Sequence, residues 1–265
     1  AAHKGAAGFK ELITYLNKPD VGDEIKKVLA TLDIPFTTLA SIAVYQGTAG
    51  FKELITYLNK PDVGDEIKKV LATLDIAFTT LLNITRNQGA ARLKELITYL
   101  HRGASTIKSV LETLEIKFSS LSNITRNQGT AGLKELITYL HREASTIKSV
   151  LETLKIKFSS LSNVAGGRGS GEFIQLITYL HREASTIKSV LETLDISFTT
   201  LATMVQSKGG AGLEELITYV NKPGVFAKIN KVLKALDIKF PTLATIAFSK
   251  GKAGLEELIT YLNKP

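Results

Sequence analysis

Glu11-Leu12-Ile13-Thr14-Tyr15-Leu16 is the stretch from which the organisation of this chain follows. The same six residues return, apart from Gln175 and Val220, at start-to-start spacings of 42, 42, 40, 40, 40 and 42 residues. These later copies begin at Glu53, Glu95, Glu135, Gln175, Glu215 and Glu257. Repetition at one period of this length is typical of a solenoid, in which each unit buries its apolar face against its neighbours.

The copy at residues 129–168 shows the pattern within one repeat. Apolar residues at helical spacing predict a first helix over 133–140 and a second over 147–154, and a third, shorter helix begins near Phe158. Ser145 and Thr146 are candidate caps for the second helix. We therefore expect an all-α superhelical solenoid, right- or left-handed, built from three-helix repeats of 40–42 residues. It would form a single domain over residues 1–265, with six repeat intervals and partial terminal units.

Composition narrows the function classes. The 33 Lys and Arg residues exceed the 25 Asp and Glu residues, which favours an anionic partner but does not identify it. Because the chain has no cysteine, disulfides, thiolate zinc sites and thiol nucleophiles are excluded. No apolar run approaches the length of a membrane span, and no signal-peptide core stands at the N-terminus. We expect an intracellular monomer without membrane contact.

Repetition also argues against catalysis. A single active site would need a residue set that occurs once, and the chain shows none. His101, His141 and His181 stand at equivalent helix ends one repeat apart, too far apart to share a metal ion. We therefore expect no enzyme activity, no cofactor and no metal. The tyrosine of each copy, such as Tyr15 or Tyr57, could stack on bases, although packing with a hydrogen-bonded hydroxyl is typical of buried tyrosines.

The loop between the third helix and the next first helix carries the informative variation. A glycine is present in every copy, and the residue before it, here named the variable residue, is always Gln, Arg or Lys. Gln can bond to the major-groove edge of adenine, and Arg or Lys can bond to guanine. The predicted base-reading residues are Lys4, Gln46, Gln88, Gln128, Arg168, Lys208 and Lys250.

Residues beside the variable residue are candidates for bracing the loop or contacting the nucleic-acid backbone. They comprise the residues just before it, the fixed glycines, and the hydroxyl residues that begin the first helix, where free amides favour phosphate. The candidates are His3, Tyr45, Asn87, Asn127, Gly167, Ser207, Ser249, Gly47, Gly89, Gly129, Gly169, Gly209, Gly251, Thr48, Thr130 and Ser170.

This loop resembles the repeats of transcription activator-like effectors and their bacterial relatives, which are modular readers of double-stranded DNA. Those repeats carry Ile-Ala-x-x-x-Gly, and the second member of the residue pair before the glycine reads one base. The matching segments begin at Ile42, Ile84, Ile124, Val164, Met204 and Ile246, and the similarity continues into the first helix. The present repeats are longer, with an additional helix, and mostly carry Ala-Gly where that family has a Lys-Gln pair that contacts phosphates.

The resemblance implies that each repeat reads one base along one strand, and that the protein acts in the nucleus of a host cell if it is an effector. Sequence-specific binding of double-stranded DNA in the major groove is therefore the leading hypothesis. Two alternatives stay open: an RNA partner, and a protein-binding scaffold whose concave face holds an extended acidic peptide.

Overall fold

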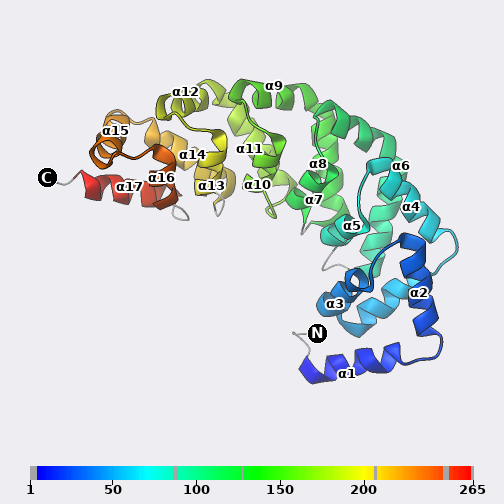
Figure 1. Cartoon of the computed structure of the whole chain (residues 1–265). Coiled ribbons are helices and arrows are strands. Elements are labelled where there is room, and N and C mark those ends of the chain that lie inside the picture. The colour runs from blue at the N-terminus through cyan, green and yellow to red at the C-terminus, as the bar shows by residue number, and fades with distance from the viewer. Residues whose placement is uncertain (1–4, 86–88, 127, 206–207, 247–250, 264–265) are drawn as a thin grey trace. The chain divides into compact units, whose positions relative to one another are not determined.

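The computed structural model describes residues 5–85, 89–126, 128–205, 208–246 and 251–263, and throughout these ranges the regular structure is helical, with no strand. The chain divides into two compact units, Ala1–Ile137 and Thr138–Pro265. The first contains α1 (Gly5–Leu16), α2 (Val21–Leu32), α3 (Phe36–Leu58), α4 (Val63–Leu74), α5 (Phe78–Thr85), α6 (Gly89–Thr113), α7 (Phe118–Thr125) and the start of α8 (Gly129–Arg142). The second continues with α9 (Ala144–Leu154), α10 (Phe158–Val164), α11 (Ser170–Arg182), α12 (Ala184–Leu194), α13 (Phe198–Val205), α14 (Gly209–Val220), α15 (Val225–Leu236), α16 (Phe240–Ile246) and α17 (Gly251–Leu262) (Figure 1).

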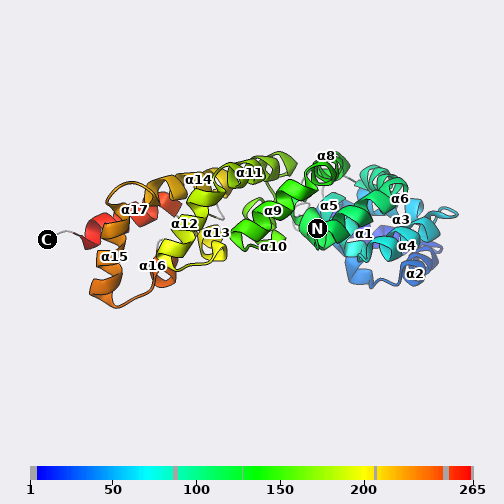
Figure 2. The ribbon, with the colours of Figure 1, turned by 90° about the horizontal axis from the view of Figure 1, so that it is seen from above.

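In the second unit, helices that are equivalent in sequence pack against each other. The first helices α11, α14 and α17 contact one another in turn, as do the third helices α10, α13 and α16, and the second helices α9 and α12 also touch. Figure 2 shows α11, α14 and α17 following one another along this unit. Each repeat therefore covers an apolar face of the repeat before it.

The first unit repeats these contacts with two pairs of helices fused. The second half of α3 and the first half of α6 are the first helices of their repeats. Accordingly, α1 contacts α3, and α3 contacts α6. The second helices α2 and α4 also touch, as do the third helices α5 and α7. Within α3 a third and a first helix meet at Gly47, whose φ of 72° lies outside the helical region. Only glycine adopts such an angle without strain, which explains why the kink occurs there.

The predicted apolar stripes form the core. Leu133, Leu136 and Leu140 of the first helix are fully buried, as are Ile147, Val150 and Leu154 of the second helix and Phe158, Leu161 and Val164 of the third, each at most 5% exposed. Burying one such side chain contributes about 1.5–3 kcal/mol, so packing rather than helix propensity stabilises these short helices.

The expected break between the first and second helices is absent in one repeat. In two of the three 40-residue repeats the break lies at Glu143 and Glu183, whose backbone angles are not helical. Each of these carboxylates binds the arginine before it and the threonine three residues after it. Gly103 occupies this position in α6 and offers no such carboxylate, so the helix runs through it and the three-helix prediction is wrong for that repeat.

Ser145 and Thr146 were expected to cap the second helix, and the structure corrects this. Both lie inside α9, which begins at Ala144, and the residue before it is Glu143. The Thr146 hydroxyl donates to the Glu143 carboxylate across 3.4 Å instead of accepting from a backbone amide.

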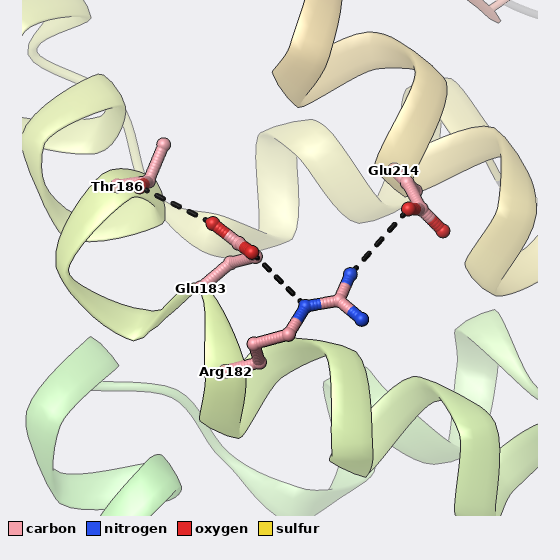
Figure 3. A network of polar contacts seen from close by, with 4 residues as sticks. All are labelled: Arg182, Glu183, Thr186 and Glu214. Atoms are coloured by element: carbon pink, nitrogen blue, oxygen red, sulfur yellow. Dashed lines mark hydrogen bonds and ion pairs between the residues drawn. The ribbon is translucent and has the colours of Figure 1, made fainter.

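A polar network joins two repeats of the second unit. Arg182 Nε donates to Glu183 Oε1 at 3.0 Å, and its Nη2 atom lies 3.5 Å from Glu214 Oε1 on α14 (Figure 3). The guanidinium also lies 5.6 Å from the centre of the Tyr179 ring. The three charged side chains are partly or largely exposed, so their ion pairs contribute little to stability.

Candidate nucleic-acid interface

Three of the seven variable residues, Gln128, Arg168 and Lys208, have side chains within the described part of the chain, and all three are exposed. Lys4, Gln88 and Lys250 lie outside the described residues, as do the side chain of Gln46 and, among the neighbours, His3, Asn87, Asn127, Ser207, Ser249 and the side chain of Tyr45. The geometry of the site is therefore built from these three loops.

One backbone hydrogen bond recurs in the three loops. The variable residue donates its backbone N–H to the carbonyl three residues earlier: Gln128 to Thr125 at 2.9 Å, Arg168 to Ala165 at 3.0 Å and Lys208 to Val205 at 2.8 Å. In these three repeats the variable residue therefore closes a turn at the end of the third helix.

The glycine that follows has a conformational reason to be there. Gly129, Gly169 and Gly209 have φ values of 63°, 103° and 65°, which other residues adopt only with strain. With these angles, the three buried glycines turn the chain from the loop into the first helix.

A second glycine, four residues after the variable residue, shapes the path of the variable side chain. A Cβ atom built on Gly132 would overlap the Gln128 side chain, whose Cδ atom lies 2.9 Å away, and one built on Gly212 would overlap Lys208 Cβ. The variable side chain therefore folds over the first turn of the following helix. Sequence reasoning assigned no role to these glycines, although their recurrence at Gly8, Gly50, Gly132, Gly212 and Gly254 is a signal that could have found them.

Lys208 extends along its own helix. Its Nζ atom lies 3.7 Å from Glu215 Oε2, with the two side chains 41% and 54% exposed. An ion pair this exposed contributes about 0–1 kcal/mol, so a stronger anionic or hydrogen-bonding partner can displace the carboxylate.

Arg168 belongs to a repeat in which Glu172 replaces the second glycine. Glu172 Oε1 accepts a hydrogen bond of 2.7 Å from the backbone N–H of Gly210, in the next repeat. The Cδ and Nε atoms of Arg168 lie 2.9 Å from the point where a Cβ on Gly209 would stand. The side chains of Arg168 and Glu172 thus both face Gly209 and Gly210, at the start of α14 in the next repeat.

The hydroxyl residues at the helix starts point inward. Thr48, Thr130 and Ser170 are buried, and the Thr130 hydroxyl has no hydrogen-bond partner within the described structure. A phosphate could reach these hydroxyls only after a rearrangement, which favours the loop-bracing role. Gly167, with a φ of 71°, lies exposed just before Arg168.

A groove of about 490 Å³ lies between α3 and α6 in the first unit. Three lysines line it, together with one glutamate, one tyrosine and two alanines: Lys52, Lys60, Lys94, Glu53, Tyr57, Ala49 and Ala91. Burial, together with the negative charge of Glu66, raises the pKa of Tyr57 from 10.0 to about 12, so its hydroxyl stays neutral even at moderately alkaline pH. The groove therefore presents three cations, one carboxylate and a neutral hydroxyl.

The described ranges were also compared with what a metal site and a membrane span require. These ranges contain no cluster of three or more His, Asp or Glu side chains suited to a metal ion, and none of their helices combines the length and apolarity needed to cross a bilayer. Comparison of the chain with protein-family models, with curated proteins and with solved structures found no match.

Proposed function

We propose that this protein binds double-stranded DNA sequence-specifically, as a superhelical α-solenoid in which one loop residue per repeat reads one base in the major groove. The observation that supports the proposal is the backbone hydrogen bond that recurs at the variable residue in the three described loops. Gln128, Arg168 and Lys208 leave equivalent turns as exposed, hydrogen-bonding side chains.

The solenoid part of the proposal rests on the packing inside each unit. Equivalent helices touch from one repeat to the next inside each unit, which supports a regular stacking of the repeats. Such an arrangement presents the variable residues at regular intervals, which a repeating base ladder requires.

The chemistry of the variable residues supplies the specificity. Gln can exchange two hydrogen bonds with adenine, and the donors of Arg or Lys match N7 and O6 of guanine. The sequence therefore predicts adenine opposite Gln128 and guanine opposite Arg168 and Lys208. The net charge of +8 supplies attraction to phosphates that does not depend on base sequence.

Selection from random DNA duplexes tests the proposal. The Arg168→Gln variant should change the preference at a single base pair by about 1–3 kcal/mol and leave the other positions unaltered. Arg182→Gln is the matched control, because it makes the same chemical change away from the loops and should alter no position. A selected motif that is the same for all three proteins would refute base reading by the loop.

The salt dependence of binding provides an independent measurement. Each phosphate contact made by a cation lowers the slope of log affinity against log salt concentration by about 0.9. A titration with duplex DNA, single-stranded DNA and RNA at two salt concentrations should give the tightest binding and a steep slope for the duplex. Tighter binding of RNA would assign the loops to that partner instead.

The lysine-lined groove of the first unit favours a second candidate function, the binding of an extended acidic peptide. Lys52, Lys60 and Lys94 supply its positive charge. Under this alternative, Lys52→Gln together with Lys94→Gln abolishes binding of a poly-glutamate probe, whereas Arg168→Gln has no effect on any ligand. Under the DNA proposal, the Arg168→Gln variant changes base preference.

A further inference from the structure

The residue four positions after the variable residue, here named the +4 residue, differs among the three described loops. It is glycine in two of them and glutamate in the third: Gly132 after Gln128, Gly212 after Lys208, and Glu172 after Arg168. The two glycines are buried, and a Cβ atom on either would overlap the variable side chain. Glutamate brings such a Cβ atom, so the loop that precedes it has to take another path.

The loop before α11 does take another path. Its fixed glycine, Gly169, has a φ of 103°, whereas φ is 63° at Gly129 and 65° at Gly209. The third helix α10 ends at Val164, one residue earlier in its repeat than α7 and α13. The first helix α11 begins one residue after the fixed glycine, whereas α8 and α14 begin at it. The loop that carries Arg168 is therefore longer at both ends.

Along this path Arg168 reaches the next repeat. Its Cδ and Nε atoms lie 2.9 Å from the point where a Cβ atom on Gly209 would stand, and Glu172 Oε1 lies 2.5 Å from the same point. The half-buried carboxylate is held there, because the backbone N–H of Gly210 donates to it. The guanidinium and the carboxylate are therefore neighbours at the start of α14, whereas the other two described variable side chains lie over their own helices.

We propose that Glu172 is a positioning residue, which directs Arg168 towards the next repeat and thereby sets the base preference of its own repeat; the second step rests on the function proposed above. The Cβ atom of Glu172 closes the path over α11, and its carboxylate attracts the guanidinium. Arginine has five N–H donors, so a contact with Glu172 leaves others for guanine. A side chain that is already held loses less rotational freedom on binding, which favours the contact. The +4 residue is thus a second determinant of specificity.

Selection from random DNA duplexes tests the effect on base preference. Glu172→Gly installs the glycine of the other two repeats, so the guanine preference at the base pair of Arg168 should weaken by about fivefold or more, whereas the preference at the base pair of Gln128 should not change. Glu172→Gln keeps the Cβ atom and an oxygen for the Gly210 N–H, so it should be impaired less. Glu192→Gly is the control, because it places a destabilising glycine on the exposed face of α12, outside the loops, and should alter no position.

Nuclear magnetic resonance of the whole chain without DNA tests the path of the side chain by itself. In the wild type and in Glu172→Gln, the δ-protons of Arg168 should show a nuclear Overhauser contact to the α-proton of Gly209 that a Cβ atom would replace. Glu172→Gly should lose this contact, because the arginine can then fold over α11. The Arg168→Gln variant lacks the arginine signals and so assigns them.

The two measurements separate this inference from the proposed function. If the wild type selects a motif and Glu172→Gly leaves the guanine preference unchanged, the inference is wrong and the proposed function stands. If no motif is selected, the proposed function fails, and the contact between Arg168 and Gly209 alone decides whether Glu172 directs the arginine.

Three further results would overturn the inference: a wild type without the contact, a Glu172→Gly variant that keeps it, or a Glu172→Gln or Glu192→Gly variant as impaired as Glu172→Gly. If circular dichroism shows that Glu172→Gly is misfolded, Glu172→Ala replaces it. That variant removes the carboxylate beside Arg168, so both the contact and the guanine preference should weaken.

Discussion

Glu172 Oε1 accepts a hydrogen bond from the backbone N–H of Gly210, which lies 38 residues further along the chain, across 2.7 Å. Most other repeats carry glycine at the Glu172 position, so this repeat has exchanged a small residue for a side chain that reaches its neighbour. The amide belongs to the first turn of α14, where backbone N–H groups have no partner within the helix. A carboxylate there also interacts favourably with the helix dipole.

Replacing Glu172 by alanine should loosen the start of α14. We expect a loss of about 1 kcal/mol in the free energy of unfolding, because the amide loses a partly buried, charge-assisted bond. Amide hydrogen exchange at Gly210 should become faster by a corresponding factor. Glu192→Ala is the control: it removes a carboxylate that forms only an exposed pair with Lys188, 3.9 Å away, and exchange at Gly210 should not change.

Alanine substitution should have opposite effects at two glycines of the first helices. In Gly212→Ala the new methyl group overlaps Lys208 Cβ, an atom that cannot move without the backbone, so we expect destabilisation by about 1–3 kcal/mol. In Gly171→Ala nothing lies within 4 Å of the new Cβ, and the gain in helix propensity should stabilise the protein by up to about 1 kcal/mol. Urea denaturation of the two variants measures both signs. Equal effects would show that the Lys208 side chain does not fold over Gly212.

Removing the carboxylate beside Lys208 should strengthen DNA binding if this lysine contacts DNA. Glu215→Gln frees the Lys208 ammonium from a pair that is worth at most about 1 kcal/mol, so we expect up to about a fivefold gain in affinity with little change in stability. Fluorescence anisotropy with a labelled duplex measures the gain. Glu192→Gln makes the same change of net charge on α12, and an equal gain for that variant would indicate a general charge effect.

Stability should fall at alkaline pH because of buried tyrosines. Burial raises the pKa of Tyr57 and Tyr179 from 10.0 to about 12, and the carboxylates of Glu66 and of Glu214 and Glu183 add to the shift. The unfolded chain therefore releases these protons at lower pH than the folded chain. The stabilisation is fully present below about pH 10 and is lost as the pH rises towards about 12.

Substitution of a tyrosine checks this pH dependence. Tyr179→Phe should reduce the fall in unfolding free energy between those two pH values, as measured by urea denaturation at several pH values. Tyr261→Phe changes a ring that is 68% exposed and should leave the fall unaltered. Equal curves for wild type and Tyr179→Phe would contradict the prediction.

The sequence alone predicted the all-helical character and the buried faces, although α3 and α6 each join two expected helices. Residues such as Leu133, Leu136 and Leu140 recur at helical spacing, and this spacing encodes locally which side of a helix avoids water. The position of the variable residues before a fixed glycine could also be predicted from the sequence, because the preference of glycine for a positive φ is a local property. The predictions of a solenoid and of base reading by these residues go beyond what the packing of each unit shows.

Only the tertiary structure decided how neighbouring repeats use these residues. The bond from Gly210 to Glu172 and the contact of Tyr15 with Phe51 join residues that are far apart in sequence, and they depend on how one repeat lies on the next. Phe51 and Tyr219, for example, are buried, whereas their sequence counterparts Phe9 and Tyr261 are exposed. Local periodicity specifies a face to be buried, but the partner that buries it is set by packing in three dimensions.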